Sequence, residues 1–173
     1  MSNFLYNQRV LFIHLTFMKF YSGHVGDYCL GGGSFVKENN YGHEIFNFQN
    51  ADGYYLGYAS PSGKVNLKEI GGDIEYDEHG AYLNNILVIF TSNYNGRKIC
   101  GYYKDAKVYA RPIENEDPKR FIAIANTFAP YNIICAEENG FLIPVNNRVF
   151  NVKGFGRYPI WYANKPKDKK EKK

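Results

Sequence analysis

The chain has 173 residues, a formal net charge of +4 and an aromatic fraction of 17%, with 16 Tyr, 13 Phe and one Trp. This length is typical of a single domain with a sizeable core. The last ten residues carry six Lys against Asp168 and Glu171, so they account for the whole net charge. Net charge by itself therefore gives no evidence of a nucleic-acid partner.

Cysteine usage and hydropathy exclude disulfide scaffolds and helical membrane proteins. Cys29, Cys100 and Cys135 are too few and too scattered for a disulfide framework or a zinc site. They predict reduced thiols in a cytoplasmic protein. His14 and Lys19 interrupt the apolar segment near the N-terminus, so no signal peptide is expected there. No apolar run has the length of a membrane span.

Short strand-like segments, separated by Gly, Pro and Asn turns, recur along the chain. They cover residues 9–17, 45–48, 54–59, 65–70, 86–90, 98–103, 106–111, 121–125, 132–136 and, as an edge strand, 141–144. A short helix is the alternative at 121–125 and at 132–136, and the last ordered stretch is 154–162. This spacing predicts a mainly β fold, in which a twisted antiparallel sheet closes into a barrel with few, short helices.

Residues 86–112 are the central unit of this expected sheet. Residues 86–90 are apolar and mostly β-branched, which is typical of a buried strand. Asn95 and Gly96 suit turn positions with positive φ, and two further strands follow them. Gly101 indicates a bulge or a close approach of another segment. We expect the rest of the chain to cover this antiparallel unit.

Irregular segments lie between these strands. Residues 26–42 form a long loop whose aromatic, charged and amide side chains indicate a functional loop rather than a spacer. Residues 71–80 and 114–118 are polar loops. Residues 164–173 are rich in Lys and lack apolar anchors, which predicts a disordered tail or the start of a linker. The expected organisation is one domain over residues 1–163, followed by this tail.

Known catalytic motifs are absent from the sequence. There is no P-loop, no Gly-x-Ser-x-Gly elbow, no Cys-x-x-Cys and no His-Glu-x-x-His. The carboxylates of residues 73–78 lack the spacing of a calcium loop, which favours a solvated loop. His43 and Glu44 form an acid–base pair without a nucleophile, and an anchoring role in the loop is favoured. We therefore expect no enzymatic activity, no metal and no cofactor.

The sequence does contain polar and aromatic side chains suited to a nucleobase. Aromatic faces stack on bases, and a few polar groups read their edges. The candidates are Lys37, Asn39, Tyr41, His43, Glu44 and Asn47 on the loop, and Arg157, Tyr158, Trp161 and Tyr162 near the end of the chain. The alternative is that Trp161 and Tyr162 are core residues that close one end of a barrel.

Basic side chains are the candidates for phosphate contacts. Residues 97–111 carry five cations against Asp105 alone. The expected contacts come from Lys37, Lys104, Lys107, Arg111 and Arg157. The alternative is a basic strand face that is simply solvated.

Four segments resemble a family of N-terminal recognition domains of bacterial restriction and defence proteins. They are Gly-Gly-Ser-Phe-Val-Lys-Glu-Asn (32–39), Gly-His-Glu-Ile-Phe-Asn-Phe (42–48), Gly-Tyr-Tyr-Lys-Asp-Ala-Lys-Val-Tyr (101–109) and Pro-Ile-Trp-Tyr-Ala (159–163). The first segment adds Ser34 and Phe35 to the candidate binding residues. Tyr102, Asp105 and Lys107 depart from the family pattern, which has Trp, Asn and Thr at these places.

The resemblance implies a DNA-binding module without catalysis of its own. An effector nuclease or NTPase domain would be fused to it or associated with it. By analogy of fold, such modules are similar to β-barrel modified-base readers of the PUA/EVE type, which flip a base into an aromatic pocket. Two alternatives remain: a protein-interaction or small-ligand-binding β domain without nucleic-acid binding, and an enzyme that uses His43 and Glu44.

Overall fold

A computed structural model provides the three-dimensional description of the protein. It describes residues 8–23, 26–27, 29–30, 34–59, 61–93, 95–154 and 158–163. The structure is β-rich, with 46% strand, 18% helix and two short α-helices, α1 (Ser34–Asn39) and α2 (Leu67–Ile70). The prediction of a β-rich fold with few, short helices is confirmed. Arg157 and the tail over 164–173 lie outside the described residues.

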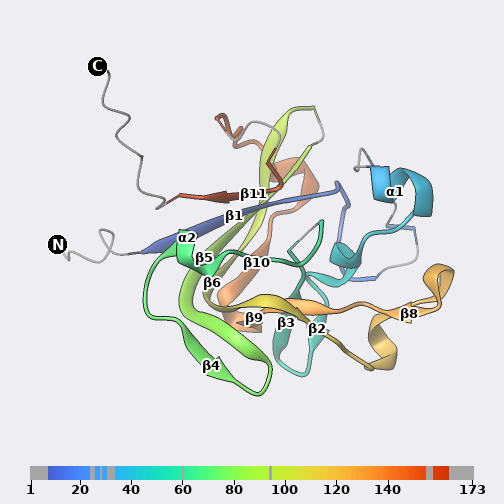
Figure 1. Cartoon of the computed structure of the whole chain (residues 1–173). Helices are drawn as coiled ribbons and strands as arrows, with labels where there is room; N and C mark the ends of the chain where they lie inside the picture. Colours follow the sequence, from blue (N-terminus) through green and yellow to red (C-terminus); the bar gives the residue numbers. More distant parts are fainter. Residues whose placement is uncertain are drawn as a thin grey trace.

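Two long strands form the centre of the sheet (Figure 1). β5 (Gly80–Asn93) and β6 (Arg97–Ile113) pair antiparallel across a turn in which Asn95 and Gly96 have φ values of 52° and 97°. The predicted central unit is thus present, but β6 is one strand where two were predicted. Asp105, with φ of 52°, lies within β6 near an irregularity of the β5–β6 register. A bulge lets the strand continue through a turn-like sequence.

The remaining strands extend this pair on both sides. The sheet order is β11-β1-β5-β6-β9-β3-β2, with β10 paired to β6 and β4 to β5. The bounds are β1 (Arg9–Leu15), β2 (Asn50–Ala51), β3 (Tyr54–Gly57), β4 (Glu75–Asp77), β9 (Tyr131–Ala136), β10 (Gly140–Leu142) and β11 (Ile160–Tyr162). A separate hairpin joins β7 (Phe121–Ile122) to β8 (Thr127–Phe128).

The sheet is mixed, and the prediction of a purely antiparallel sheet is wrong. β1 pairs parallel to β5, from Arg9 opposite Ile86 to Leu15 opposite Ser92. Parallel pairing needs a long connection, which residues 16–79 provide. Within the described residues the sheet runs as an open path from β11 to β2. Closure into a barrel is therefore unconfirmed.

Several predicted loops and strands are short helices instead. Residues 45–48 fall partly in the 3-10 helix η2 (His43–Phe46), and residues 65–70 end in α2. Residues 121–125 start as β7 and continue as η4 (Ala123–Ala125). The other 3-10 helices are η3 (Pro118–Arg120), η5 (Glu137–Asn139) and η6 (Val145–Asn147). In α2, Leu67 and Ile70 are both buried, and their separation of three residues fits one face of a helix.

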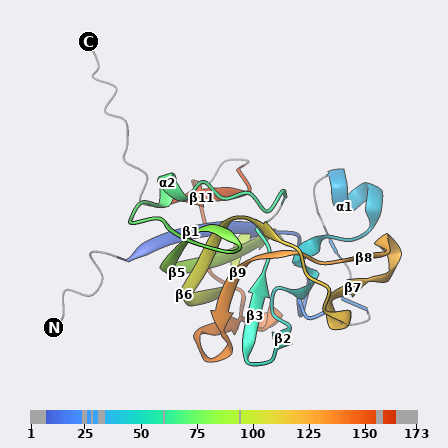
Figure 2. The same cartoon turned by 60° about the horizontal axis from the view of Figure 1, so that its bottom comes forward.

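The two ends of the molecule differ in structure. α1 and the β7–β8 hairpin lie at one end, and α2 lies at the other (Figure 1 and Figure 2). Between them, one face of the sheet packs on a core that includes Leu11, Ile13, Leu83, Val88, Phe90 and Tyr103. Cys100 and Cys135 are buried in this core and Cys29 is half-buried, all three as free thiols. Within the described chain no helix has the length and apolar character of a membrane span.

Gly101 allows three segments to approach one another closely in the core. A β-carbon at this position would overlap the Phe48 ring and the backbone oxygen of Phe141. β10 pairs with β6 at this point, with Leu142 opposite Gly101. The expected close approach at Gly101 is therefore confirmed.

Buried polar side chains fix the irregular segments to the sheet. The Asn132 side chain, which is 0% exposed, accepts a hydrogen bond from the Ala59 amide at 2.9 Å. It donates to the carbonyls of Gly63 at 2.9 Å and Tyr109 at 3.3 Å. Asn47, also 0% exposed, binds both the amide and the carbonyl of Tyr58. Each buried side-chain amide thus provides hydrogen-bond partners for backbone groups of other segments.

The buried guanidinium group of Arg148 acts in the same way. Arg148 donates to the carbonyls of Ile143, Met18 and Lys19 at 2.7–2.8 Å. On the same turn, the Asp27 carboxylate accepts hydrogen bonds from the amides of Lys19, Phe20 and Tyr21. The backbone of residues 18–21 is therefore held between a buried cation and a buried anion.

We expect Asn132→Ala to lower the free energy of unfolding by about 3 kcal/mol, because it leaves buried backbone groups without partners. Urea denaturation measures this loss. The control is Asn146→Ala, at an exposed asparagine of η6, which should change stability by less than about 0.5 kcal/mol. Equal effects of the two changes would contradict an anchoring role for Asn132.

Candidate binding surfaces

Four of the candidate residues that were predicted from the sequence lie together at η2: Phe35, Tyr41, His43 and Glu44. The ring centroids of Phe35 and Tyr41 are 5.3 Å apart, and those of Tyr41 and His43 are 5.7 Å apart. Both pairs are nearly perpendicular. The His43 ring also lies 5.1 Å from that of Tyr58, which follows β3 and was not among the candidates. We call Phe35, Tyr41, His43 and Tyr58 the loop cage.

Glu44 lies at the base of the loop cage and is 1% exposed. Its Oε1 accepts a hydrogen bond from the Thr16 amide at 3.2 Å. Burial lowers the pKa of His43, so its imidazole is neutral near pH 7. The Nδ1 atom of His43 is buried without a hydrogen-bond partner. This small site therefore holds a carboxyl group, a neutral imidazole and several aromatic faces.

The other loop candidates have different roles. Asn47 is a buried anchor of Tyr58, as described above. Asn39 donates a hydrogen bond to the Phe35 carbonyl at 2.9 Å and so stabilises α1. Ser34 and Lys37 are exposed on α1. Of the predicted loop set, the structure thus brings Phe35, Tyr41, His43 and Glu44 into one site.

The aromatic residues near the end of the chain do not form a pocket with each other. Trp161 and Tyr162 are consecutive in β11 and therefore point to opposite faces of the sheet. Tyr162 packs against the core, and its hydroxyl accepts a hydrogen bond from the Asn66 amide at 2.9 Å. Trp161 is 38% exposed, and its ring contacts that of Phe12 at 5.2 Å. Tyr158 is exposed before the strand.

Trp161 belongs to a row of apolar side chains that crosses five strands. In register, Trp161 lies opposite Phe12, Phe12 opposite Ile89, and Ile89 opposite Tyr102. Tyr102 lies opposite Phe141, with ring centroids 6.0 Å apart. Directly opposed residues share a face of a sheet, so all five point away from the core. We call these five residues the cross-strand row.

The cross-strand row is partly open to solvent. Phe141 is 50% exposed, Tyr102 39% and Trp161 38%. Val88 and Phe90, the neighbours of Ile89 in β5, are 0% exposed and belong to the core. Ile89 and the rest of the row therefore lie on the opposite face of the sheet. Apart from Trp161 and the family motif around Tyr102, no sequence pattern points to these residues, because each comes from a different strand.

The predicted phosphate-binding residues separate into two groups. Lys107 forms an ion pair with Asp77, with a distance of 2.7 Å between Nζ and Oδ2. Its ammonium also lies 3.7 Å from the centroid of the Tyr82 ring. Lys104 and Arg111 are exposed. The charge of Lys107 is therefore already paired with Asp77, whereas Lys104 and Arg111 are exposed to solvent on β6.

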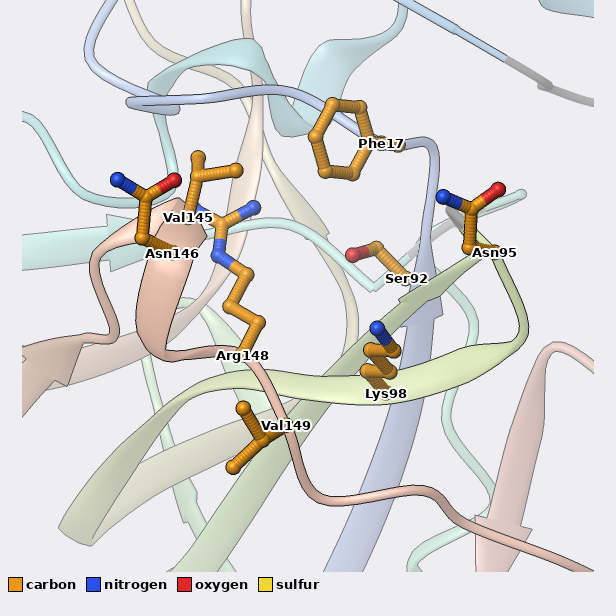
Figure 3. A pocket seen from close by; sticks show the side chains of 8 residues that line it. All are labelled: Phe17, Ser92, Asn95, Lys98, Val145, Asn146, Arg148 and Val149. Carbon is orange, nitrogen blue, oxygen red and sulfur yellow. The ribbon is translucent and has the colours of Figure 1, made fainter.

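A hollow of about 200 Å³ lies between the β5–β6 turn and η6 (Figure 3). Its lining includes Phe17, Ser92, Lys98 and Arg148. The Arg148 guanidinium points towards the Phe17 ring, 5.5 Å from its centroid. All three guanidinium nitrogens already donate to backbone carbonyls, so Arg148 serves as a structural anchor in the wall of this hollow. Among the described residues, no cluster of His, Cys, Asp or Glu has the composition of a metal site.

Comparisons of this chain with protein-family models, curated proteins and solved structures gave no match.

The Asp77–Lys107 pair makes stability depend on pH. The hydrogen bond from Lys107 lowers the pKa of Asp77 from 3.8 to about 2, with a further contribution from the Tyr109 hydroxyl. Because the folded pKa is lower than the unfolded one, the stabilisation is complete above about pH 4 and is lost as the pH falls through 2. Asp77→Asn should therefore lower Tm at pH 7 and flatten its change between pH 4 and pH 2.

Thermal unfolding followed by circular dichroism measures this difference. The control is Asp52→Asn, which removes the exposed Asp52–Lys119 pair at 3.7 Å and should leave the pH profile unchanged. A parallel pH profile for Asp77→Asn and the wild type would contradict the argument.

Proposed function

We propose that the protein is a nucleic-acid-binding recognition module that stacks unpaired bases on its cross-strand row. The observation that supports this proposal is the alignment of Phe141, Tyr102 and Trp161 on one accessible face. Sheet surfaces in RNA-binding domains stack two or three bases on exposed aromatic rings. With strands spaced by about 4.8 Å, four spacings give the row a length of roughly 19 Å.

The charge beside the row is suitable for a phosphate backbone. Lys104 lies two residues after Tyr102 in β6, on the same face, and is exposed. Arg97, the first residue of β6, contributes to lowering the pKa of His14, after the larger effect of burial. A positive group beside an aromatic platform is an arrangement that single-strand binders use.

Stacking on an open face replaces the base-flipping pocket that the sequence suggested. Trp161 and Tyr162 point to opposite faces, so they do not enclose one base. Preference for a modified base, DNA as the natural ligand, an effector nuclease or NTPase, and closure of the sheet into a barrel stay predictions. The principal alternative is a protein-interaction domain, for which the same apolar face would be the contact surface.

Trp161 is the only tryptophan of the chain, so its fluorescence reports directly on the row. We expect single-stranded oligonucleotides to quench this fluorescence in a saturable way, because a stacked base contacts the indole. Duplexes of the same sequence, unmodified or methylated, should bind more weakly unless a base is extruded. Absence of quenching and of any mobility shift by DNA or RNA at low salt would contradict the proposal and favour a protein partner.

Tyr102→Ala should weaken single-strand binding by about 1–3 kcal/mol, the usual contribution of one stacked base. The matched control is Tyr76→Ala, which removes a tyrosine that is 75% exposed on β4. Fluorescence anisotropy of a labelled oligonucleotide measures both affinities. A loss of equal size in the two variants would indicate non-specific binding.

Lys104→Ala and Lys107→Ala should differ in salt dependence. Removing Lys104 should weaken binding to all sequences alike and reduce the slope of log K against log[salt] by about 1. Lys107→Ala should leave the slope unchanged, because its charge is already paired with Asp77. Titrations at three salt concentrations distinguish these results. Unchanged slopes in both variants would exclude Lys104 as a phosphate contact.

A further inference from the structure

A small cavity next to the loop cage has the properties of a binding site for an organic cation. The cavity has a volume of about 60 Å³, and its lining includes Thr16, Phe35, His43, Glu44, Tyr58 and Pro61. It lies between α1, η2 and the segment after β3. Its residues do not belong to the cross-strand row, so it is a separate site.

One carboxyl group, that of Glu44, lines this cavity. The Glu44 side chain is 1% exposed, and its Oε1 accepts a hydrogen bond from the Thr16 amide at 3.2 Å. Among the residues that the structure describes, no Lys or Arg nitrogen lies within 4.0 Å of this group. Burial lowers the pKa of His43, so its imidazole is neutral near pH 7, and burial raises the pKa of Tyr58 to about 12, so its phenol is neutral as well. A buried carboxylate of this kind favours a cationic ligand.

The walls of the cavity suit a methylated ammonium group. Phe35, His43 and Tyr58 line it directly, and Tyr41 packs against Phe35 and His43. Aromatic cages of this type bind quaternary ammonium ligands through cation–π attraction. A hydrated metal ion would instead need several oxygen ligands, and Glu44 is the one carboxylate in this lining.

The size of the cavity limits the ligand. One water molecule needs about 10–15 Å³ of cavity volume. A cavity of 60 Å³ therefore accommodates roughly four to six atoms of the size of a water oxygen. A trimethylammonium head has a nitrogen, three methyl groups and one methylene, whereas a nucleobase is considerably larger. We propose that the loop cage and Glu44 bind the trimethylammonium head of a small organic molecule.

The test uses choline and 3,3-dimethylbutan-1-ol, which has the same shape without the charge. Titration of the full chain is followed by NMR, in which aromatic rings shift the methyl resonance of a bound ligand upfield. Choline should bind in a saturable way and at least about tenfold more tightly than the neutral alcohol. Failure of choline to bind, or equal binding of the two compounds, would overturn the proposal.

Variants then locate the site. Glu44→Gln keeps an acceptor for the Thr16 amide but removes the charge, and should reduce choline affinity to near that of the alcohol. Phe35→Leu, at a residue 45% exposed, should fold normally and weaken choline binding by roughly threefold or more. The matched control is Phe121→Leu on the β7–β8 hairpin, at a residue 41% exposed, which should bind as the wild type does. Unchanged affinity in Phe35→Leu would contradict the assignment even if Glu44→Gln fails to fold. None of these measurements involves nucleic acid, so they do not depend on the proposed function.

Discussion

Hydrogen bonds from buried amide and guanidinium groups to backbone carbonyls determine how the irregular half of this protein is arranged. Long segments between the strands have no neighbouring strand to pair with. Every buried backbone N–H and C=O group in them therefore needs a hydrogen-bond partner outside the sheet. Asn47, Asn132, Arg120 and Arg148, each at most 4% exposed, donate to such carbonyls in segments distant in sequence. Arg120, for example, reaches the carbonyls of Phe46 and Ala129 and packs over the Phe46 ring. The loop cage depends on this, because the segment that carries His43 and Glu44 ends at Phe46 and Asn47.

The sheet has the opposite character, since its regular pairing leaves one face exposed. Backbone pairing fixes the register. The register then aligns side chains from strands that are distant in sequence. The cross-strand row arises in this way, from a parallel pair beside three antiparallel ones. The two candidate sites are therefore stabilised by different interactions. Hydrogen bonds from buried polar side chains position the loop cage, whereas backbone pairing between strands positions the cross-strand row.

Part of this architecture could be predicted from the sequence. The β5–β6 pair was predictable because Ile86 and its neighbours form a buried run and because Asn95-Gly96 suits a tight turn. The parallel β1–β5 pair was not predictable. The alternation of apolar residues along a strand indicates which face is buried, but it does not indicate which strand lies beside it. The cage residues Tyr41 and His43 lie close in sequence and were predicted together from their side chains, and the family resemblance added Phe35. Phe12, Ile89 and Phe141 were not, since only the register brings them into one row.

The position of β1 in the sheet has a consequence for the order in which the fold is reached. β1 lies between β5 and β11, so Leu11 has one neighbour at Val88 and the other at Tyr162. Loop-closure entropy has to be overcome before such distant pairs are formed, and proteins with many of them fold in milliseconds to seconds. During synthesis, residues 9–15 leave the ribosome long before either partner exists. Until then, this apolar strand has both edges unpaired, which is the state in which chaperones and aggregation compete for a nascent chain.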